Sequence, residues 1–389
     1  MIPRTLFGED HEIFRSMVRR FIAAEITPRH ADWERAGIVP REVWLQAGEA
    51  GLLCTGVPEA YGGMGGDFLH STIMVEEMAR VGATAPTFYL HSEIVAPYLV
   101  RYGTEEQKHR WLPRMAKGEV IAALGMSEPS GGSDLQGMKT VALRDGDDYV
   151  INGQKVFITA GFNADLVVLA CKTDPKQKAK GVSLILVETD RPGFQRGRKL
   201  EKIGCKGQDT AELFFSDLRV PVSNLLGEEG RGFVQLMTEL PQERLVQAIR
   251  AVSSSEAALE WTLEYSKQRK MFNQTLIDFQ NTQFKLAEMK ADITAQRVFL
   301  DRCIALHLEH ELDATDAAML KLTTTELQGR VMDQCLQLFG GWGYMWEYPI
   351  ARAFVDARVG RIGGGSVEVM KQIIARAMMG DRPKRGAAS

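Results

Sequence analysis

One glycine-rich segment carries the residue types best suited to hold a ligand. Between Leu124 and Thr140 the chain reads LGMSEPSGGSDLQGMKT, which includes four glycines, one proline and several serine and acidic residues. Glycine lets a backbone approach a ligand closely, and exposed N–H groups with serine hydroxyls suit carbonyl and phosphate oxygens. A flexible linker is the simpler alternative, but Met126, Leu135 and Met138 interrupt the polar run. We therefore predict a ligand-binding loop.

A carboxylate next to a guanidinium is the second group that could do chemistry. Residues 240–245 read LPQERL, so that Glu243 stands directly before Arg244. An exposed helix carboxylate paired with a nearby arginine is the plainer interpretation of this pair. His307 and His310 are three residues apart on an expected helix, but no third ligand pattern joins them. We therefore interpret them as surface histidines and expect no metal site.

Composition limits the class of protein. A chain of 389 residues suggests two or three domains, and 45% apolar with 25% charged residues is ordinary for a soluble globular protein. The net charge of −3 argues against a general attraction to nucleic acid. Five widely spaced cysteines without a CxxC pair indicate reduced thiols. An amphipathic helix is expected close to the N-terminus and no apolar stretch could span a membrane, so that we expect a cytoplasmic protein without a targeting peptide.

The elements that must position these groups change in kind twice along the chain. Apolar residues recur at helical spacing up to residue 117, and Thr104 with Gln107 is placed as a capping box. Beyond residue 120, the dipeptides Asp145-Gly146 and Asn152-Gly153 predict hairpin turns between short strands. Long helical patterns return after residue 232, and Pro241 is expected to break or kink the first of them.

These expected elements can be placed by residue range. The helical patterns cover residues 12–36, 42–53, 70–81 and 105–117. The strands are expected at residues 140–143, 149–151, 155–159, 166–170, 182–187 and 211–215. Short strands joined by tight turns favour an antiparallel barrel or sandwich. We predict a helical domain over 1–122, a β domain over 123–231, a second helical domain over 232–380 and a disordered tail over 381–389.

The glycine-rich segment closely resembles the flavin-contacting loop of the acyl-CoA dehydrogenase family, which reads roughly T-E-P-x-A-G-S-D followed by Thr. The resemblance runs from about residue 10 to about residue 377 and covers five motifs. It implies an α+β fold with a helical N-terminal domain, a middle antiparallel β-barrel and a C-terminal four-helix bundle, and FAD as the cofactor. Within this loop it implies cofactor contacts from Leu124, Met126, Ser127, Gly132 and Ser133, and Ser133 would also contact the acyl-CoA.

Three further motifs extend the resemblance to FAD. Residues 157–159, FIT, match the family's W/F-I-T/S element, in which the ring flanks the isoalloxazine and the hydroxyl supports N5, although core packing is the plainer interpretation. Residues 265–280 match the Arg-x-x-Phe…Gln pattern, and residues 337–343 match the Q-x-x-G-G-x-G turn. In the family both reach the diphosphate and adenosine of a neighbouring subunit's FAD. The cofactor contacts implied here are Phe157, Ile158, Thr159, Arg269, Phe272, Gln280, Gln337, Gly340 and Gly341.

The fifth motif departs from the commonest family pattern. Most members carry the catalytic base as Glu in a Y-E-G-T segment near the C-terminus, but residues 362–366 here read IGGGS, with Gly364 at that position. A smaller group carries the base on the helix after the β domain, just before an arginine, as Glu243 and Arg244 stand here. Residues 206–215, KGQDTAELFF, resemble the long-chain type within this group. The implied roles are catalytic base for Glu243, backbone N–H donor to the thioester oxygen for Gly364, substrate contacts for Arg244 and Gly365, and cofactor contacts for Ser366 and Glu368.

The resemblance implies an FAD-dependent acyl-CoA dehydrogenase that forms a trans double bond between Cα and Cβ of a medium-chain, long-chain or branched acyl-CoA in fatty-acid or branched-acid catabolism. It also implies an electron-transfer flavoprotein as electron acceptor and a homotetramer. Two alternatives stay open: an oxidase or monooxygenase on the same scaffold, and a catalytically silent acyl-CoA or FAD-binding protein. The absence of Glu at position 364 motivates the second alternative, and Glu243 weakens it. The sequence does not fix chain length or branching, because the pocket lining is spread over several helices.

Overall fold

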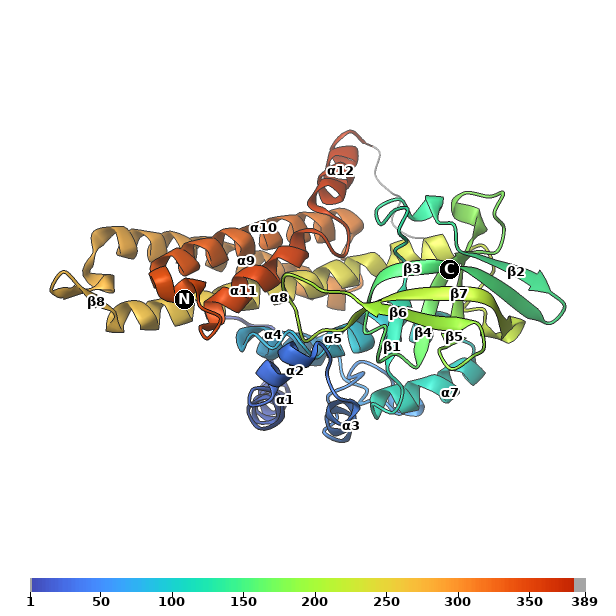
Figure 1. Cartoon of the computed structure of the whole chain (residues 1–389). Coiled ribbons are helices and arrows are strands. Elements are labelled where there is room, and N and C mark those ends of the chain that lie inside the picture. Colours follow the sequence, from blue (N-terminus) through green and yellow to red (C-terminus); the bar gives the residue numbers. More distant parts are fainter. Residues whose placement is uncertain (1, 381–389) are drawn as a thin grey trace.

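Helices form the N-terminal region, as the apolar periodicity predicts. The computed structural model describes residues 2–380, and Figure 1 shows these helices packed beneath the long C-terminal helices and beside the sheet. Thr104 and Gln107 form the expected capping box, because each side chain accepts a hydrogen bond from the other residue's backbone N–H. The helices are α1 Glu9–Phe21, α2 His30–Ala36, α3 Arg41–Glu49, α4 Phe68–Arg80, α5 Phe88–Leu90, α6 Ala96–Tyr102 and α7 Glu105–Ala116, with π-helical turns η1 Ile22–Ile26 and η3 His91–Val95.

A seven-stranded sheet forms the middle of the described chain, in the order β1-β4-β2-β3-β7-β6 with β5 paired to β4. Its strands are β1 Ala122–Gly125, β2 Val141–Asp145, β3 Asp148–Thr159, β4 Leu166–Lys172, β5 Val182–Glu188, β6 Phe194–Lys199 and β7 Thr210–Pro221. Most neighbours are antiparallel, as predicted, but β1 runs parallel to β4, and β2 meets β4 in one parallel pair. Two parallel strands need a long connection between them. The glycine-rich segment and the β2–β3 hairpin form this connection between β1 and β4.

One of the two predicted hairpin turns is wrong. The turn after Asp145 joins β2 to β3, and Asp145 pairs with Asp148 as expected. Asn152-Gly153 instead lies inside β3, where the register against β7 shifts between Ile151 and Gly153 in a bulge. Thr140 Oγ1 lies 2.6 Å from where a Cβ of residue 153 would stand. Glycine at this position therefore permits a close approach of two segments and forms no turn.

The C-terminal region is a helical bundle built around one long helix. Its helices are α8 Gly232–Gln268, α9 Gln280–Leu308, α10 Ala314–Phe339, α11 Pro349–Ala357 and α12 Val367–Met378, and the short strands β8 Lys270–Met271 and β9 Gln274–Thr275 form a hairpin after α8. Of the break or kink predicted at Pro241, the break does not occur, because α8 continues through this residue. Buried Leu236 and Leu245 pack in separate apolar clusters on either side of Pro241, and this packing holds the helix together. The predicted tail, 381–389, lies outside the described residues.

Helix α8 connects the three regions of the fold. Its first turns pack Leu236 in one apolar cluster with Leu99 of α6 and Leu184 of β5, and Leu124 and Met126 of the glycine-rich segment lie against the same cluster. Its later turns pack against α4, α9 and α10. The predicted α+β architecture is confirmed, and no helix within residues 2–380 combines the length and apolarity that a membrane crossing needs.

Candidate active site

Glu243 lies where α8 passes the continuous segment formed by α5, η3 and α6. Only 5% of Glu243 is exposed, and the Tyr98 hydroxyl donates a hydrogen bond of 2.9 Å to its Oε1. Burial raises the pKa of Glu243 to about 7, even though the hydrogen bond from Tyr98 lowers it. A carboxyl group with this pKa gains and loses a proton near neutral pH, as a general base must. An exposed, arginine-paired carboxylate is therefore the wrong description of Glu243.

A second carboxylate repeats this arrangement one helical turn earlier. Glu239 is buried, and the Tyr102 hydroxyl donates a hydrogen bond of 2.7 Å to its Oε1. Arg101, which is half exposed, forms an ion pair of 3.0 Å with the same carboxylate. Tyr98 and Tyr102 of α6 thus face Glu243 and Glu239 of α8 at matching four-residue spacing. Sequence reasoning missed both tyrosines and Glu239, although this spacing within each helix is visible in the sequence.

Arg244 is buried beside Glu243 and holds unused hydrogen-bond donors. Its guanidinium reaches only the Ala314 carbonyl, at 3.5 Å, and its Nε has no hydrogen-bond partner among the described residues. Burial lowers the pKa of Arg244, although Glu243 opposes this effect. A buried guanidinium with free donors suits a ligand that carries acceptor oxygens.

The segment around Gly364 lies one turn farther along α8. Gly364 has a φ of 65°, and a Cβ added to it would lie 3.7 Å from Cγ of Gln247, the residue one turn after Glu243. The buried Lys321 of α10 donates a hydrogen bond of 2.5 Å to the Gly365 carbonyl. Ser366 accepts from the Val369 N–H as the N-cap of α12, and Glu368 is exposed in its first turn. The structure therefore brings Gly364 to the helix that carries Glu243. Lys321 was not among the residues predicted from the sequence.

A buried ion pair fixes the base of the glycine-rich loop. Lys155 of β3 donates to Glu128 Oε1 at 2.9 Å and to the Met126 carbonyl at 3.0 Å. Glu128 also accepts from the backbone N–H groups of Lys139 and Thr140, at 2.6 and 3.0 Å. Burial opposes ionisation of Glu128, but Lys155 and these donors outweigh it and lower its pKa. Glu128 thus joins both ends of the loop, a role the sequence analysis did not assign.

The predicted flavin-contacting residues lie where this loop meets the end of β3. The Ser127 carbonyl accepts a hydrogen bond of 2.9 Å from the Val156 N–H, which places the loop next to Phe157. Phe157 is 68% exposed with a φ of 61°, whereas Ile158 is buried. Thr159 is half buried and its Oγ1 accepts from Gln208 at 3.2 Å; Gly132 and Ser133 are exposed.

An exposed aromatic ring on a left-handed backbone is unusual for core packing, and a non-glycine residue with this φ is strained. The exposed face of Phe157 therefore fits a planar ring system such as a flavin better than it fits the core. Gly131 and Gly132 beside it border open space, since an added Cβ would meet no atom within 3.4 Å. These residues together fit the FAD that the resemblance implies.

Six further predicted cofactor residues lie at the far end of the bundle, whereas Ser366 and Glu368 lie at the start of α12. Arg269 and Phe272 flank the start of the β8–β9 hairpin, at the opposite end of the molecule from the sheet (Figure 1). Tyr265 stacks on Phe339 with ring centroids 4.2 Å apart, which joins the end of α8 to the end of α10. Arg269, Phe272, Gln280, Gln337, Gly340 and Gly341 are all exposed at this end.

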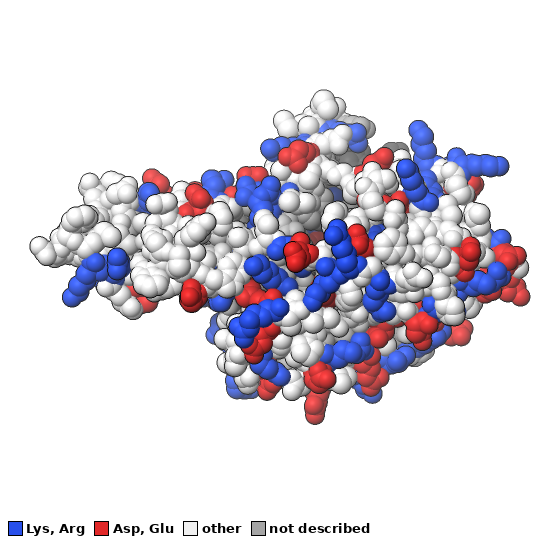
Figure 2. Space-filling model, in the orientation of Figure 1, with Lys and Arg blue, Asp and Glu red and all other residues white. Residues whose placement is uncertain are grey.

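These two groups of residues lie at opposite ends of the molecule (Figure 1). Glu243 and Arg269 are 26 residues apart along α8, which corresponds to about 39 Å. The far end is also apolar: Phe272 is 87% exposed and Tyr344 is 84% exposed. Figure 2 shows few charged side chains over this end of the molecule. The structure therefore separates the predicted flavin contacts from the predicted adenosine contacts within one chain.

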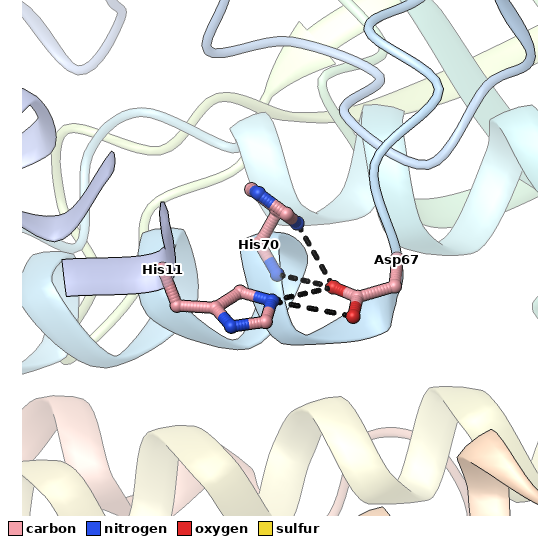
Figure 3. A group of neighbouring side chains, drawn as sticks. All are labelled: His11, Asp67 and His70. Carbon is pink, nitrogen blue, oxygen red and sulfur yellow. Dashed lines mark hydrogen bonds and ion pairs between the residues drawn. The ribbon is translucent and has the colours of Figure 1, made fainter. Parts of the chain in front are cut away.

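A group of two histidines and one aspartate lies at the start of α4 (Figure 3). Asp67 caps α4, and it accepts hydrogen bonds from His70 Nδ1 at 2.9 Å and from His11 Nε2 at 3.1 Å. His11 Nδ1 accepts from the Gly8 N–H, so this cluster ties α1 to α4 through hydrogen bonds. Of the two histidines noted in the sequence, His310 is exposed as expected, but His307 is half buried against the Phe68 ring.

A pocket lies between α4, α5, α8, α10 and α11, and Gln247 is one of its lining residues. Its lining mixes apolar side chains such as Met78 and Phe88 with polar ones such as Arg250 and Gln328. Because the lining comes from five helices and from the segment between α4 and α5, its shape could not be predicted from a local motif.

Known proteins resemble this chain along nearly its whole length. Models of the acyl-CoA dehydrogenase N-terminal, middle and C-terminal domains match residues 8–119, 123–218 and 230–379. The mitochondrial long-chain specific acyl-CoA dehydrogenase of Sus scrofa is 51% identical over 381 residues, which cover 97% of this chain and 89% of that protein.

Solved structures agree in both fold and family. An acyl-CoA dehydrogenase from Geobacillus kaustophilus is 49% identical with a TM-score of 0.95, covering 97% of this chain and 100% of that one. A glutaryl-CoA dehydrogenase from Mycobacterium smegmatis, solved in complex with FADH2, is 27% identical with a TM-score of 0.89, covering 97% of each chain. The chain therefore belongs to the acyl-CoA dehydrogenase family of FAD-dependent oxidoreductases.

Proposed function

We propose that Glu243 removes the α-proton of the bound acyl-CoA while the backbone N–H of Gly364 binds the thioester oxygen. The α,β-dehydrogenation of an acyl-CoA, which the family performs, requires loss of a weakly acidic proton from Cα. FAD, when bound, supplies the acceptor for the hydride that leaves Cβ. The observation that carries the proposal is the burial of Glu243, which raises its pKa to about 7, on the helix that also reaches the Gly364 segment.

The residues around Glu243 suit the charge that develops on the thioester. Removal of the α-proton places negative charge on the thioester oxygen, and preorganised donors stabilise such a charge strongly in a site without water. Gly364 offers its N–H without a side chain, so that space remains for a carboxylate from α8. Two buried cations add a favourable field: Lys321, which donates to the Gly365 carbonyl, and Arg244, which stands next to Glu243. We assign substrate contacts to Ser133, Arg244 and Gly365.

We also propose a long-chain acyl-CoA as the substrate. The support is the identity of 51% to a long-chain specific relative, together with the base on α8 in place of the C-terminal loop. A panel of acyl-CoA thioesters that differ in length and branching, compared by their rates of flavin bleaching, tests this assignment.

The separation of the two groups of predicted cofactor residues along α8 supports a cofactor site shared by two subunits. We propose that the loop residues and Phe157 contact the flavin of their own subunit, while Arg269, Phe272, Gln280, Gln337, Gly340 and Gly341 contact the adenosine and diphosphate of a neighbour's FAD. The exposed aromatic side chains of Phe272 and Tyr344 at the far end of the bundle support burial against another subunit. We propose a homotetramer on this basis.

An electron-transfer flavoprotein is the proposed electron acceptor, and the cytoplasm is the proposed location. An oxidase on the same scaffold is the competing function, and it would pass the electrons to oxygen. Stoichiometric hydrogen peroxide in air-saturated buffer, without reduction of an added electron-transfer flavoprotein, would favour the oxidase.

The Glu243→Gln variant tests the proposed function directly. The amide keeps the shape and hydrogen-bonding capacity of the side chain but removes the base, so that FAD should stay bound. Anaerobic bleaching of the flavin by palmitoyl-CoA should slow by about 10²–10⁴-fold or more. Glu260→Gln, an exposed position on the same helix, is the matched control. Glu243→Gly combined with Gly364→Glu should recover part of the rate, whereas bleaching of Glu243→Gln at the parent's rate would contradict the assignment.

A further inference from the structure

Two tyrosine–glutamate pairs lie between α6 and α8, and the proposed role of Glu243 as the base does not explain why there are two. Tyr98 and Tyr102 are four residues apart, as are Glu239 and Glu243, and each hydroxyl donates to one carboxylate, at 2.9 and 2.7 Å. Tyr98, Glu239 and Glu243 are all at most 5% exposed. Buried hydroxyl and carboxylate groups are costly unless they are paired, so these four side chains form one polar cluster between the helices.

The hydrogen bond from Tyr98 constrains Glu243 in two ways. Burial raises the pKa of Tyr98 well above its ordinary value, so that its hydroxyl stays protonated and can only donate to the carboxylate. A donated hydrogen bond favours the ionised carboxylate, and it also holds Oε1 so that Oε2 is left to meet a proton. Glu243 receives no other hydrogen bond from a side chain of the described residues. Tyr98 is therefore the group that orients this carboxylate.

Two charged groups on α8 act on Glu243 in opposite directions. Glu239 lies one turn before it on α8 and disfavours a second negative charge, whereas Arg244 on α8 favours that charge. Glu239 is itself held by Tyr102 and Arg101 of α6, and Lys321 of α10 faces Arg244. Glu93, a further buried carboxyl nearby on η3, interacts with Ser71 of α4 instead.

We propose that Tyr98 is a positioning residue that keeps Glu243 ionised and correctly oriented, and that Glu239 opposes this effect. The inference rests on the proposed role of Glu243 as the base. Two neighbours thus shift the pKa of one carboxylate in opposite directions. Tyr98 donates to it, and Glu239 repels its charge.

The test measures the pH at which Glu243 ionises in the FAD-loaded enzyme. Infrared spectra identify its protonated carboxyl band as the one that Glu243→Gln removes, and the pH at which half of this band is lost gives the midpoint. In parallel, stopped-flow measurements record the rate of flavin bleaching by palmitoyl-CoA against pH. The infrared midpoint does not depend on turnover.

Tyr98→Phe should raise the midpoint by about one to two pH units, because a hydrogen bond to a charged group contributes about 1.5–3 kcal/mol. Its bleaching rate should also stay below that of the parent at high pH, where both carboxylates are ionised but only the parent's is oriented. Glu239→Gln should lower the midpoint. Tyr102→Phe, the matched control, makes the same chemical change one turn away and should not raise it.

An unchanged or lowered midpoint in Tyr98→Phe would overturn the proposal. If Tyr98→Phe loses FAD or does not fold, Glu239→Gln decides, and an unchanged or raised midpoint there overturns the proposal equally. Undiminished bleaching by Glu243→Gln would instead contradict the assignment of the base. The infrared midpoints would still show whether Tyr98 and Glu239 act on Glu243, so the two failures can be told apart.

Discussion

Replacing Glu243 by glutamine should stabilise the folded protein at alkaline pH while it abolishes catalysis. The parent must hold a carboxylate in a buried site above neutral pH, whereas the unfolded chain exposes the same carboxylate to water. The pKa of Glu243 is higher in the folded protein than in the unfolded chain. Its contribution to stability is therefore fully present below the unfolded pKa and is lost as the pH rises through the folded pKa. Glutamine does not ionise and escapes this loss.

The size of the effect follows from the two pKa values. A rise from 4.5 to about 7 corresponds to about 3 kcal/mol of stability lost between acid and alkaline pH. Unfolding entropies of about 2.1 cal/mol/K per residue convert this loss to about 4 °C in melting temperature for a chain of this length. The difference in melting temperature between Glu243→Gln and the parent should therefore grow by about 4 °C from pH 4.5 to pH 8.

Thermal melts of the FAD-loaded parent and variant across this pH range measure the effect. Glu260→Gln is the control, since its carboxylate is exposed and paired with Arg80 at the surface, and such pairs contribute only about 0–1 kcal/mol. The difference in melting temperature between Glu260→Gln and the parent should change little with pH. If the melting temperatures of Glu243→Gln and the parent differ by the same amount at acid and alkaline pH, then Glu243 is not a strained, buried carboxylate and the reasoning fails.

Three further predictions test other parts of the structure. Lys155→Met leaves Glu128 buried without its partner, which costs about 3–5 kcal/mol; melting temperature and FAD content should both fall, whereas Lys139→Met on the exposed side of the same loop should change neither. Arg269→Glu should lower FAD affinity about tenfold or more and weaken the oligomer, since a hydrogen bond to a charged group contributes about 1.5–3 kcal/mol; Lys267→Glu is its control, and a monomeric Arg269→Glu variant with full FAD content would argue against a shared site. Ser133→Ala should weaken acyl-CoA binding by about 0.5–1.5 kcal/mol in titrations while the protein stays soluble, and an insoluble variant would show that the exposed Ser133 has a structural role.

Local patterns predicted the elements whose signals are local. The capping box at Thr104 and Gln107 and the hairpin turn after Asp145 depend on a few consecutive residues, and both are present in the structure. The turn predicted at Gly153 and the helix break predicted at Pro241 are absent, because tertiary packing determines the backbone at both positions. Thr140 packs against Gly153, and apolar clusters on both sides of Pro241 keep α8 continuous.

The candidate site was predictable where the chain resembles a family motif and, for the glycine-rich loop, also from residue types that suit a ligand. Glu243, Gly364 and the glycine-rich loop could be named in this way. Tyr98, Lys155 and Lys321 could not, because each acts through a partner that is distant in sequence, at 145, 27 and 44 residues. A lysine or tyrosine in an apolar pattern gives no sign that it will be buried, and its partner is fixed only by the packing of two helices or strands.

The left-handed backbone of Gly364 bears on how such an enzyme could evolve. A glutamate introduced there would find open space, with Gln247 Cγ at 3.7 Å from its Cβ, but would carry a strain of about 1–2 kcal/mol. A descendant with both glutamates would place two carboxylates near one substrate carbon, and like charges so close would share one proton between them. One of the two would remain ionised and able to act. A lineage could therefore gain the second carboxylate before it lost the first, so that the base could move between two segments of the fold without an inactive ancestor.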